Sequence, residues 1–209
     1  MTKVLIAGTG GFADEVACWA KGIFDIVGYI VSRESAGNGF ERPGLRFTDE
    51  EVTPEKAETD CVLLAIGSSE IRKRLHFIYK NKGFRFPNLI HSTSTLFGAI
   101  NLGEGIIIAP HCVISTNVRI GDMSYLNFQC GIGHDSIIGN YVQINPGAQL
   151  GGSSLIGDES LIGSGSTILQ GIEVGSKVTV ASGSVVFSKI PDGTTVIGNP
   201  AKRIPALER

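Results

Sequence analysis

From Ile90 to Val186 every sixth residue is aliphatic, over seventeen consecutive positions without an insertion. The next residue is often glycine, and the residue two places earlier is mostly small or β-branched. A fixed period of six predicts a parallel β-helix, in which each hexad forms one short strand and a turn. Three hexads make a coil of about 18 residues, and coils stack about 4.8 Å apart. Between about Leu96 and Ser188 there is room for about five coils.

The period also predicts which residues are neighbours in successive coils. Cys112 and Cys130 are 18 residues apart and are expected to stack inside one corner as free, buried thiols. His134 is expected directly beneath Gly152. Since it follows the inward-facing Ile132 by two places, His134 should lie at a corner that faces outward.

The first part of the chain has a different pattern. Apolar runs predict buried strands at 3–8, 25–31 and 60–69. Apolar residues at helical spacing predict one helix directly after the first glycine cluster and a second helix over 70–82. Alternation of strands and helices is typical of a small Rossmann-like sheet. We therefore expect an α/β domain over residues 1–88 and a β-helix with a C-terminal tail over 89–209.

Two polar loops follow predicted strands of the α/β domain. Gly8, Gly10 and Ala13 fit the spacing G-x-G-x-x-A, which lets backbone amides at a helix start approach a phosphate. A second loop, 67–69, ends another strand, and ligands bind at such carboxyl ends. Arg72 is either an exposed helix residue or a phosphate contact. After the second strand, where dinucleotide sites carry an acidic residue, the chain has Ser32 and Arg33, which leaves NADP and the identity of the nucleotide base open.

Composition restricts the classes of binding partner and the cellular compartment that we expect. The formal net charge is −2, so no basic surface for nucleic acid is expected. No apolar run approaches the length of about 20 residues that a membrane helix needs, and the four cysteines form no C-x-x-C pair. We expect a cytoplasmic protein without a membrane or nucleic-acid partner.

The motifs together resemble those of one enzyme group. A hexad ladder that ends in GNPAKRI, with GHDSIIGNYVQINPGAQLGG inside it and a glycine-loop α/β domain before it, resembles the sugar acetyltransferases related to sialic acid O-acetyltransferases and nucleotide-aminosugar N-acetyltransferases (the NeuD/PglD-like group). The resemblance covers the whole chain. It implies that the β-helix is left-handed and that members are homotrimers with active sites between subunits.

The resemblance also implies roles for particular residues. His134 matches the catalytic base, and Asp135 matches its acidic neighbour. The residues implied to bind acetyl-CoA are Gly152 (through its N–H to the thioester carbonyl), Gln143, Ala181, Gly198 and Lys202. The residues implied to bind the nucleotide-linked sugar are Gly8, Gly10, Gly11, Phe12, Gly67, Ser68 and Ser69. Gln143 stands where many members have a second histidine, which leaves its role open.

The function expected from this resemblance is transfer of an acetyl group from the cosubstrate acetyl-CoA, without a metal, to the amine of a nucleotide-linked sugar such as a 4-amino-4,6-dideoxy sugar. One alternative is O-acetylation of a sialic-acid-like sugar. A second is a zinc-dependent β-helical carbonic anhydrase, for which residues 96–188 offer only His111 and His134, at different corners. A third is a scaffold without enzymatic activity.

Overall fold

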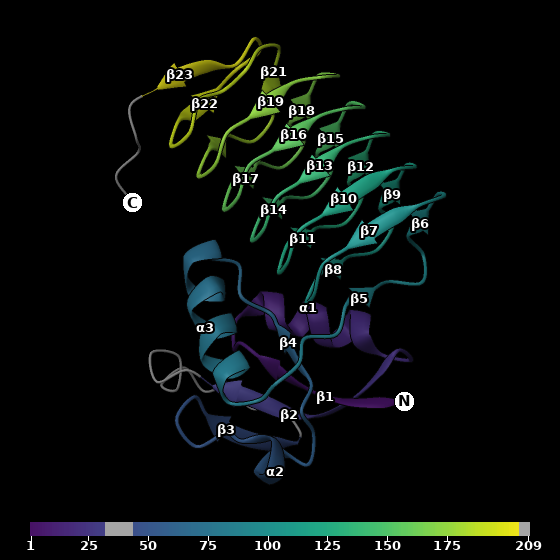
Figure 1. Ribbon diagram of the computed structural model, residues 1–209, viewed down its shortest axis with the longest axis vertical. Helices are drawn as coiled ribbons and strands as arrows, with labels where there is room; N and C mark the ends of the chain where they lie inside the picture. The colour runs from purple at the N-terminus through teal and green to yellow at the C-terminus, as the bar shows by residue number, and fades with distance from the viewer. Residues whose placement is uncertain (32–43, 205–209) are drawn as a thin grey trace. The chain divides into compact units, whose positions relative to one another are not determined.

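The computed structural model describes residues 1–31 and 44–204 (Figure 1). The chain divides into two compact units, Met1–Leu89 and Ile90–Arg209. The first unit contains β1 (Thr2–Ala7), α1 (Gly11–Ala20), β2 (Phe24–Val31), β3 (Leu45–Thr48), α2 (Pro54–Ala57), β4 (Val62–Leu64) and α3 (Ser69–Asn81), and β5 (Leu89–Ile90) spans the boundary.

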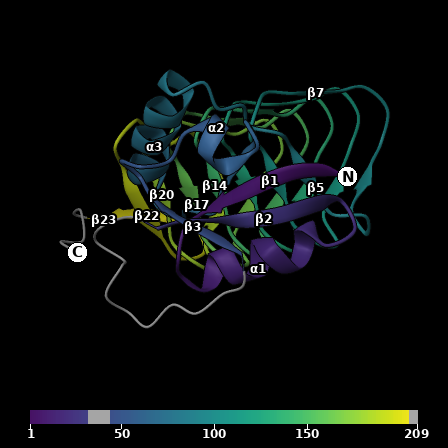
Figure 2. The same cartoon turned by 90° about the horizontal axis from the view of Figure 1, so that it is seen from below.

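The first unit is a four-stranded parallel sheet with helices on both faces. The strand order is β3-β2-β1-β4, and Figure 2 shows α1 on one side of the sheet with α2 and α3 on the other. Leu5 and Ile6 of β1 are fully buried, as are Val16 and Ala20 of α1. Because β1 and β4 are adjacent and parallel, the loops that lead into α1 and α3 leave the same edge of the sheet.

The structure of this unit differs from the sequence prediction in three of its elements. The strand expected over 60–69 is only Val62–Leu64, and Ser69 already begins α3. The structure also contains β3 and α2, which have four residues each and were not predicted. Elements this short hold few of the residues on which a periodicity depends. Ser32 and Arg33 lie outside the described residues.

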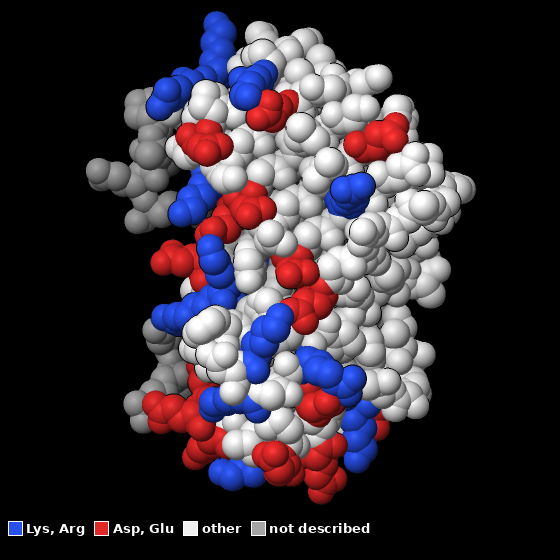
Figure 3. All heavy atoms as spheres, in the orientation of Figure 1, with Lys and Arg blue, Asp and Glu red and all other residues white. Residues whose placement is uncertain are grey.

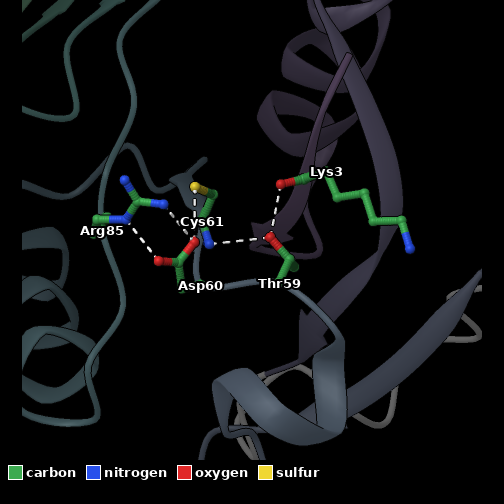
Figure 4. Close-up of polar contacts among 5 residues, drawn as sticks. All are labelled: Lys3, Thr59, Asp60, Cys61 and Arg85. Carbon is green, nitrogen blue, oxygen red and sulfur yellow. Dashed lines mark hydrogen bonds and ion pairs between the residues drawn. The ribbon is translucent and has the colours of Figure 1, made fainter.

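A polar cluster fastens the opposite ends of β1 and β4 (Figure 4). Arg85 forms a two-pronged contact with Asp60, Nε to Oδ2 at 2.6 Å and Nη2 to Oδ1 at 2.9 Å. Hydrogen bonding from Arg85 lowers the pKa of Asp60. The Thr59 hydroxyl donates to the Lys3 carbonyl at 2.7 Å and accepts from the Cys61 N–H at 3.2 Å. These contacts fix the two strands whose other ends carry the glycine loops.

The second unit is a parallel β-helix with three sheets. With β5, the first sheet contains β8 (Ile107–Ile108), β11 (Tyr125–Leu126), β14 (Gln143–Ile144), β17 (Leu161–Ile162), β20 (Thr179–Val180), β22 (Thr195–Ile197) and β23 (Lys202–Ile204). The second contains β6 (Thr95–Leu96), β9 (Val113–Ile114), β12 (Gly131–Ile132), β15 (Gln149–Leu150), β18 (Thr167–Ile168) and β21 (Val185–Val186). The third contains β7 (Ile100–Leu102), β10 (Val118–Ile120), β13 (Ile137–Ile138), β16 (Leu155–Ile156) and β19 (Glu173–Val174).

The pairing follows the predicted period of 18 until the last coil. Ile132 of β12 pairs with Leu150 of β15, for example. In the last coil Thr179 pairs with Thr195, so this coil is two residues shorter. The antiparallel strand β23 then pairs with β22 and covers the end of the first sheet, which protects an open edge. The predicted fold class, a Rossmann-like α/β domain followed by a left-handed parallel β-helix, is confirmed.

The interior of the β-helix has the predicted composition. The ladder residues between Ile108 and Val186 are buried, and Cys112 and Cys130 are free and buried among them. Buried serines satisfy their own hydroxyls: Ser124 donates to the Gly139 carbonyl at 2.7 Å and accepts from the Val142 N–H at 3.0 Å. Polar side chains can therefore replace aliphatic ones inside the coil without leaving an unpaired group.

Each turn of the coil needs one residue in the left-handed backbone conformation. Such residues recur every six positions, and where they are not glycine they include His111, Asn117, Gln129, Asp135 and Ser153, with φ between 58° and 62°. Asparagine and aspartate tolerate this conformation best after glycine. The backbone thus accounts for an aspartate at position 135, although not for the histidine before it.

Candidate active site

His134 and Asp135 form a side-chain pair on the turn between β12 and β13. His134 Nδ1 lies 2.7 Å from Asp135 Oδ2, and both side chains are 51% exposed. The carboxylate occupies one ring nitrogen, so the other, Nε2, remains available to a substrate. This is the arrangement of a base and its orienting carboxylate.

The His134 imidazole lies against Gly152 of the next coil. A Cβ atom built on Gly152 would be 2.6 Å from Nε2, 2.7 Å from Cε1 and 2.9 Å from Cδ2. Only glycine leaves the ring this space. Gly152 is buried and its carbonyl accepts from the Gly171 N–H at 2.9 Å, whereas its own N–H has no acceptor among the described residues. An N–H without an acceptor, beside a histidine, can donate a hydrogen bond to an oxygen of a ligand.

Asp135 also has a hydrogen-bond partner in the preceding coil. Asn117 Nδ2 donates to Asp135 Oδ1 at 3.2 Å. Hydrogen bonds from His134 and then from Asn117 lower the pKa of Asp135, so the carboxylate stays charged well below neutral pH. Asn117 and Asp135 line an open groove of about 640 Å³ on the third sheet, together with Asn101 and Arg119.

The residues assigned to acetyl-CoA lie apart from His134 within one chain. Gln143 is on β14 of the first sheet, where Nε2 donates to Asn145 Oδ1 at 2.7 Å. Ala181 and Gly198 belong to the last coils: the Ala181 N–H donates to the Val196 carbonyl, and the Gly198 N–H donates to Ser184 Oγ at 3.1 Å. Lys202 is exposed on β23. Of this set, the structure brings only Gly152 against the histidine.

The first glycine loop of the α/β unit contains two kinds of glycine. Gly8 has φ +137°, and a Cβ there would lie 2.5 Å from the Ala65 carbonyl oxygen. Gly8 therefore serves the close packing of β1 against the β4 loop. A Cβ at Gly10 or Gly11 would meet nothing within 4 Å, so their outer sides are open. Gly10 is the N-cap of α1 and has no side chain to cover the helix start.

The remaining predicted residues of this site lie beside that loop. A Cβ at Gly67, which ends the segment after β4, would also meet nothing within 4 Å. Ser68 caps α3, since its hydroxyl accepts from the Ile71 N–H at 3.4 Å, and Ser69 is the first residue of that helix. Phe12 packs edge-to-face against Trp19 in α1. Two helix starts with open glycines at one sheet edge form a suitable anion site.

Arg72 is neither the exposed helix residue nor the phosphate contact that its sequence position suggested. It is only 2% exposed, so it is not a solvated helix residue. Its Nη1 donates to the carbonyls of Ile66 at 2.7 Å and Gly67 at 3.0 Å. The guanidinium therefore holds the second loop in shape from within. The sequence offered no signal for this, because arginine on a helix is usually exposed.

Within 1–31 and 44–204, no three or more histidine, cysteine, aspartate or glutamate side chains gather as metal ligands would. No helix in the same ranges has the length and apolarity needed to cross a bilayer.

Comparisons with known proteins agree with this architecture. Residues 155–188 match the family described as the hexapeptide repeat of succinyl-transferase. The acetyltransferase domain of PglB from Neisseria gonorrhoeae is 29% identical, with a TM-score of 0.74 over 98% of this chain and all (100%) of that one. A second structure of that domain holds acetyl coenzyme A.

Two other solved structures share the fold over almost the full length of both chains. WeeI from Acinetobacter baumannii is 24% identical with a TM-score of 0.85, over 98% of this chain and 100% of that one. PerB from Caulobacter crescentus, in complex with CoA and GDP-perosamine, is 22% identical with a TM-score of 0.68, over 98% of each chain.

The fold and these comparisons define the class of this protein as an acetyltransferase of the hexapeptide-repeat type with an N-terminal α/β domain. Within that class, the resemblance to the NeuD/PglD-like sugar acetyltransferases is confirmed.

Proposed function

We propose that this protein transfers the acetyl group of acetyl-CoA to the amine of a nucleotide-linked amino sugar, such as a 4-amino-4,6-dideoxy sugar, with His134 as general base. The acetyl donor agrees with the acetyl coenzyme A held by the PglB domain. The observation that carries the proposal is the position of His134, whose Nδ1 is held by Asp135 while its ring lies against Gly152.

The reaction is a direct transfer without an acyl-enzyme. The sugar amine attacks the thioester carbonyl carbon, a C–N bond forms, and His134 Nε2 takes a proton from the nitrogen. The C–S bond then breaks, and the imidazolium returns the proton to the departing CoA thiolate. Imidazole suits both proton transfers because histidine ordinarily titrates near neutral pH.

Asp135 and Gly152 assist from opposite sides of the ring. Because the Asp135 carboxylate accepts the Nδ1–H, it selects the tautomer with a basic Nε2 and stabilises the imidazolium. The Gly152 N–H would donate to the oxyanion of the tetrahedral intermediate. One such donor typically contributes about 3 kcal/mol to transition-state stabilisation.

The α/β unit supplies the proposed acceptor site. The open glycines at the starts of α1 and α3 allow backbone amides to approach a diphosphate, and the helix dipoles favour its charge. We assign Gly8, Gly10, Gly11, Phe12, Gly67, Ser68 and Ser69 to this site. Gly8 and Ser68 act through loop shape, since one packs on Ala65 and the other caps α3.

Acetyl-CoA binding and assembly belong to the same proposal. We assign to acetyl-CoA binding Gln143, Ala181, Gly198 and Lys202. They would meet His134 across a homotrimer interface, since within one chain they lie apart from it. Two exposed apolar side chains beside the His134 turn support such an interface, namely Ile137 at 43% and Leu155 at 41% exposure on the third sheet.

The test is acetyl transfer from labelled acetyl-CoA to three acceptors: nucleotide-linked 4-amino-4,6-dideoxy sugars with different bases, their 4-hydroxy counterparts, and a sialic acid. The proposal expects a stable amide product from an amino sugar only. Product from the sialic acid alone would replace it with the O-acetyltransferase. No product from any acceptor would reject the activity.

A further inference from the structure

Asn117 and Asp135 occupy the same position in successive coils. They are 18 residues apart, and both have left-handed backbones, with φ of 59° and 58°. The Asp135 N–H donates to the Thr116 carbonyl at 3.0 Å, so the two turns are joined by a backbone hydrogen bond. The side chains consequently leave the coil one above the other, and the Asn117 amide reaches Asp135 Oδ1 at 3.2 Å.

The two oxygens of Asp135 have different partners. Oδ2 is 2.7 Å from His134 Nδ1, and Oδ1 accepts from Asn117. An aspartate carboxylate rotates easily about its last torsion, and this one is half exposed. A partner on each oxygen therefore sets the plane of the carboxylate, and with it the direction of the imidazole. The Asn117 amide is a neutral donor, so it orients Asp135 without neutralising the charge that an imidazolium needs.

Polar side chains at another corner of the coil behave differently. Asn140 Oδ1 accepts from the Asp122 N–H at 2.8 Å, and Asp158 Oδ1 accepts from the Asn140 N–H at 2.8 Å. Asn140 Nδ2 also donates to Asp158 Oδ1, at 3.4 Å, but the shorter contacts join side chain to backbone and hold the coils together. The Asn117 side chain instead reaches only another side chain among the described residues. Its contact serves the half-exposed dyad rather than the backbone of the β-helix.

We propose that Asn117 is a positioning residue for the His134–Asp135 pair, holding Asp135 so that His134 keeps its proton on Nδ1 and presents Nε2 to the acceptor. This inference rests on the proposed function of His134. Asn117 touches neither the substrate nor the reacting atoms in this account. It acts through Asp135 alone.

The test compares two substitutions in one column of turns. Asn117→Gly removes the amide and suits the left-handed backbone, so it should not strain the turn. Ser153→Gly is the matched control: Ser153 has the same φ of 58° on the other side of Asp135, and its side chain makes no hydrogen bond among the described residues. Asn117→Asp keeps the shape but replaces the donor by a carboxylate that repels Asp135.

Two readouts separate positioning from structure. For Asn117→Gly and Asn117→Asp, kcat should fall about 10-fold to 100-fold, as small misplacements of catalytic groups do. KM should stay unchanged, and Ser153→Gly should match the unaltered protein. In ¹⁵N-histidine NMR spectra of the full protein, His134 should carry its proton on Nδ1, whereas Asn117→Gly should populate the Nε2–H tautomer.

The outcomes are decisive in each direction. Asn117→Gly with unchanged kcat, or with reduced kcat and an unchanged tautomer, would overturn the inference. If the unaltered protein transfers no acetyl group to any acceptor, the proposed function fails, and the tautomer measurement still decides the role of Asn117.

Discussion

The imidazole of His134 and the backbone of Gly152 occupy adjoining positions in successive coils, so closely that a Cβ on Gly152 would come within 2.6 Å of Nε2. The left-handed turn does not require this glycine, whose φ is not positive. Without a side chain, Gly152 leaves space for the ring, and in the proposed reaction its N–H would face the oxyanion. The catalytic account depends on this relationship.

Gly152→Ala should therefore cost activity more than stability. The His134 side chain is half exposed and can rotate away from the new methyl group, which would break its contact with Asp135. We expect a change of less than about 1 kcal/mol in the free energy of unfolding, below the usual cost of an overpacked core. We also expect a loss of roughly 100-fold in kcat. Urea unfolding and steady-state kinetics measure both; an alanine variant with normal kcat would contradict the account.

Asp135→Asn tests the charge beside the ring. The pKa of Asp135 is lowered in the folded protein, so its carboxylate stabilises the fold above the ordinary aspartate pKa, and this stabilisation is lost as pH falls through the lowered pKa. Unfolding free energies of the two proteins should therefore differ at pH 5 and converge in acid below both the folded and the unfolded pKa of Asp135. At neutral pH the variant should lose most of its kcat. A difference in stability that persists in strong acid would refute this role of the charge.

The glycines of the first loop should separate into two classes. Gly8→Ala should destabilise the protein by about 1–3 kcal/mol, because it combines a disfavoured φ with a contact of 2.5 Å to the Ala65 carbonyl. Gly10→Ala should leave stability almost unchanged but weaken binding of the nucleotide-linked sugar, because its methyl group would stand where the diphosphate approaches. Thermal unfolding with and without the sugar nucleotide distinguishes the two. Equal effects of both substitutions would argue against the assignment.

The proposed interface can be tested on the third sheet. Replacing both Ile137 and Leu155 by aspartate places charges where we expect subunits to meet. Since both side chains are exposed in the single chain, the fold should survive while the trimer dissociates and activity is lost. Sedimentation and circular dichroism measure the two properties, with Val113→Asp on the second sheet as an exposed apolar comparison. An active, monomeric double variant would show that the site is complete within one chain.

The β-helix could be predicted from sequence because every inward position is set by one period. That period alone places Gly152 over His134 and Cys130 over Cys112. It did not predict the last coil, where Thr179 pairs with Thr195 after 16 residues, since a single shortened coil has no repeat of its own.

Contacts between side chains were harder to predict from the sequence. The period brings Asn117 and Asp135 into one column, but the direction of the two side chains was needed to reveal their hydrogen bond. The burial of Arg72 arises from the carbonyls of a loop that carries no pattern. In the α/β unit, β3 and α2 are too short for periodicity to identify them.

The role of His134 as general base is tested by the rate of acetyl transfer from acetyl-CoA to the accepted amino sugar in His134→Ala, compared with His111→Asn. His111 has a left-handed φ of 61°, which asparagine also tolerates, and we assign it a structural role only. We expect a fall in kcat of at least about 100-fold for His134→Ala, with unchanged thermal stability and a normal rate for His111→Asn. A His134→Ala protein with the kcat of the unaltered enzyme would contradict it.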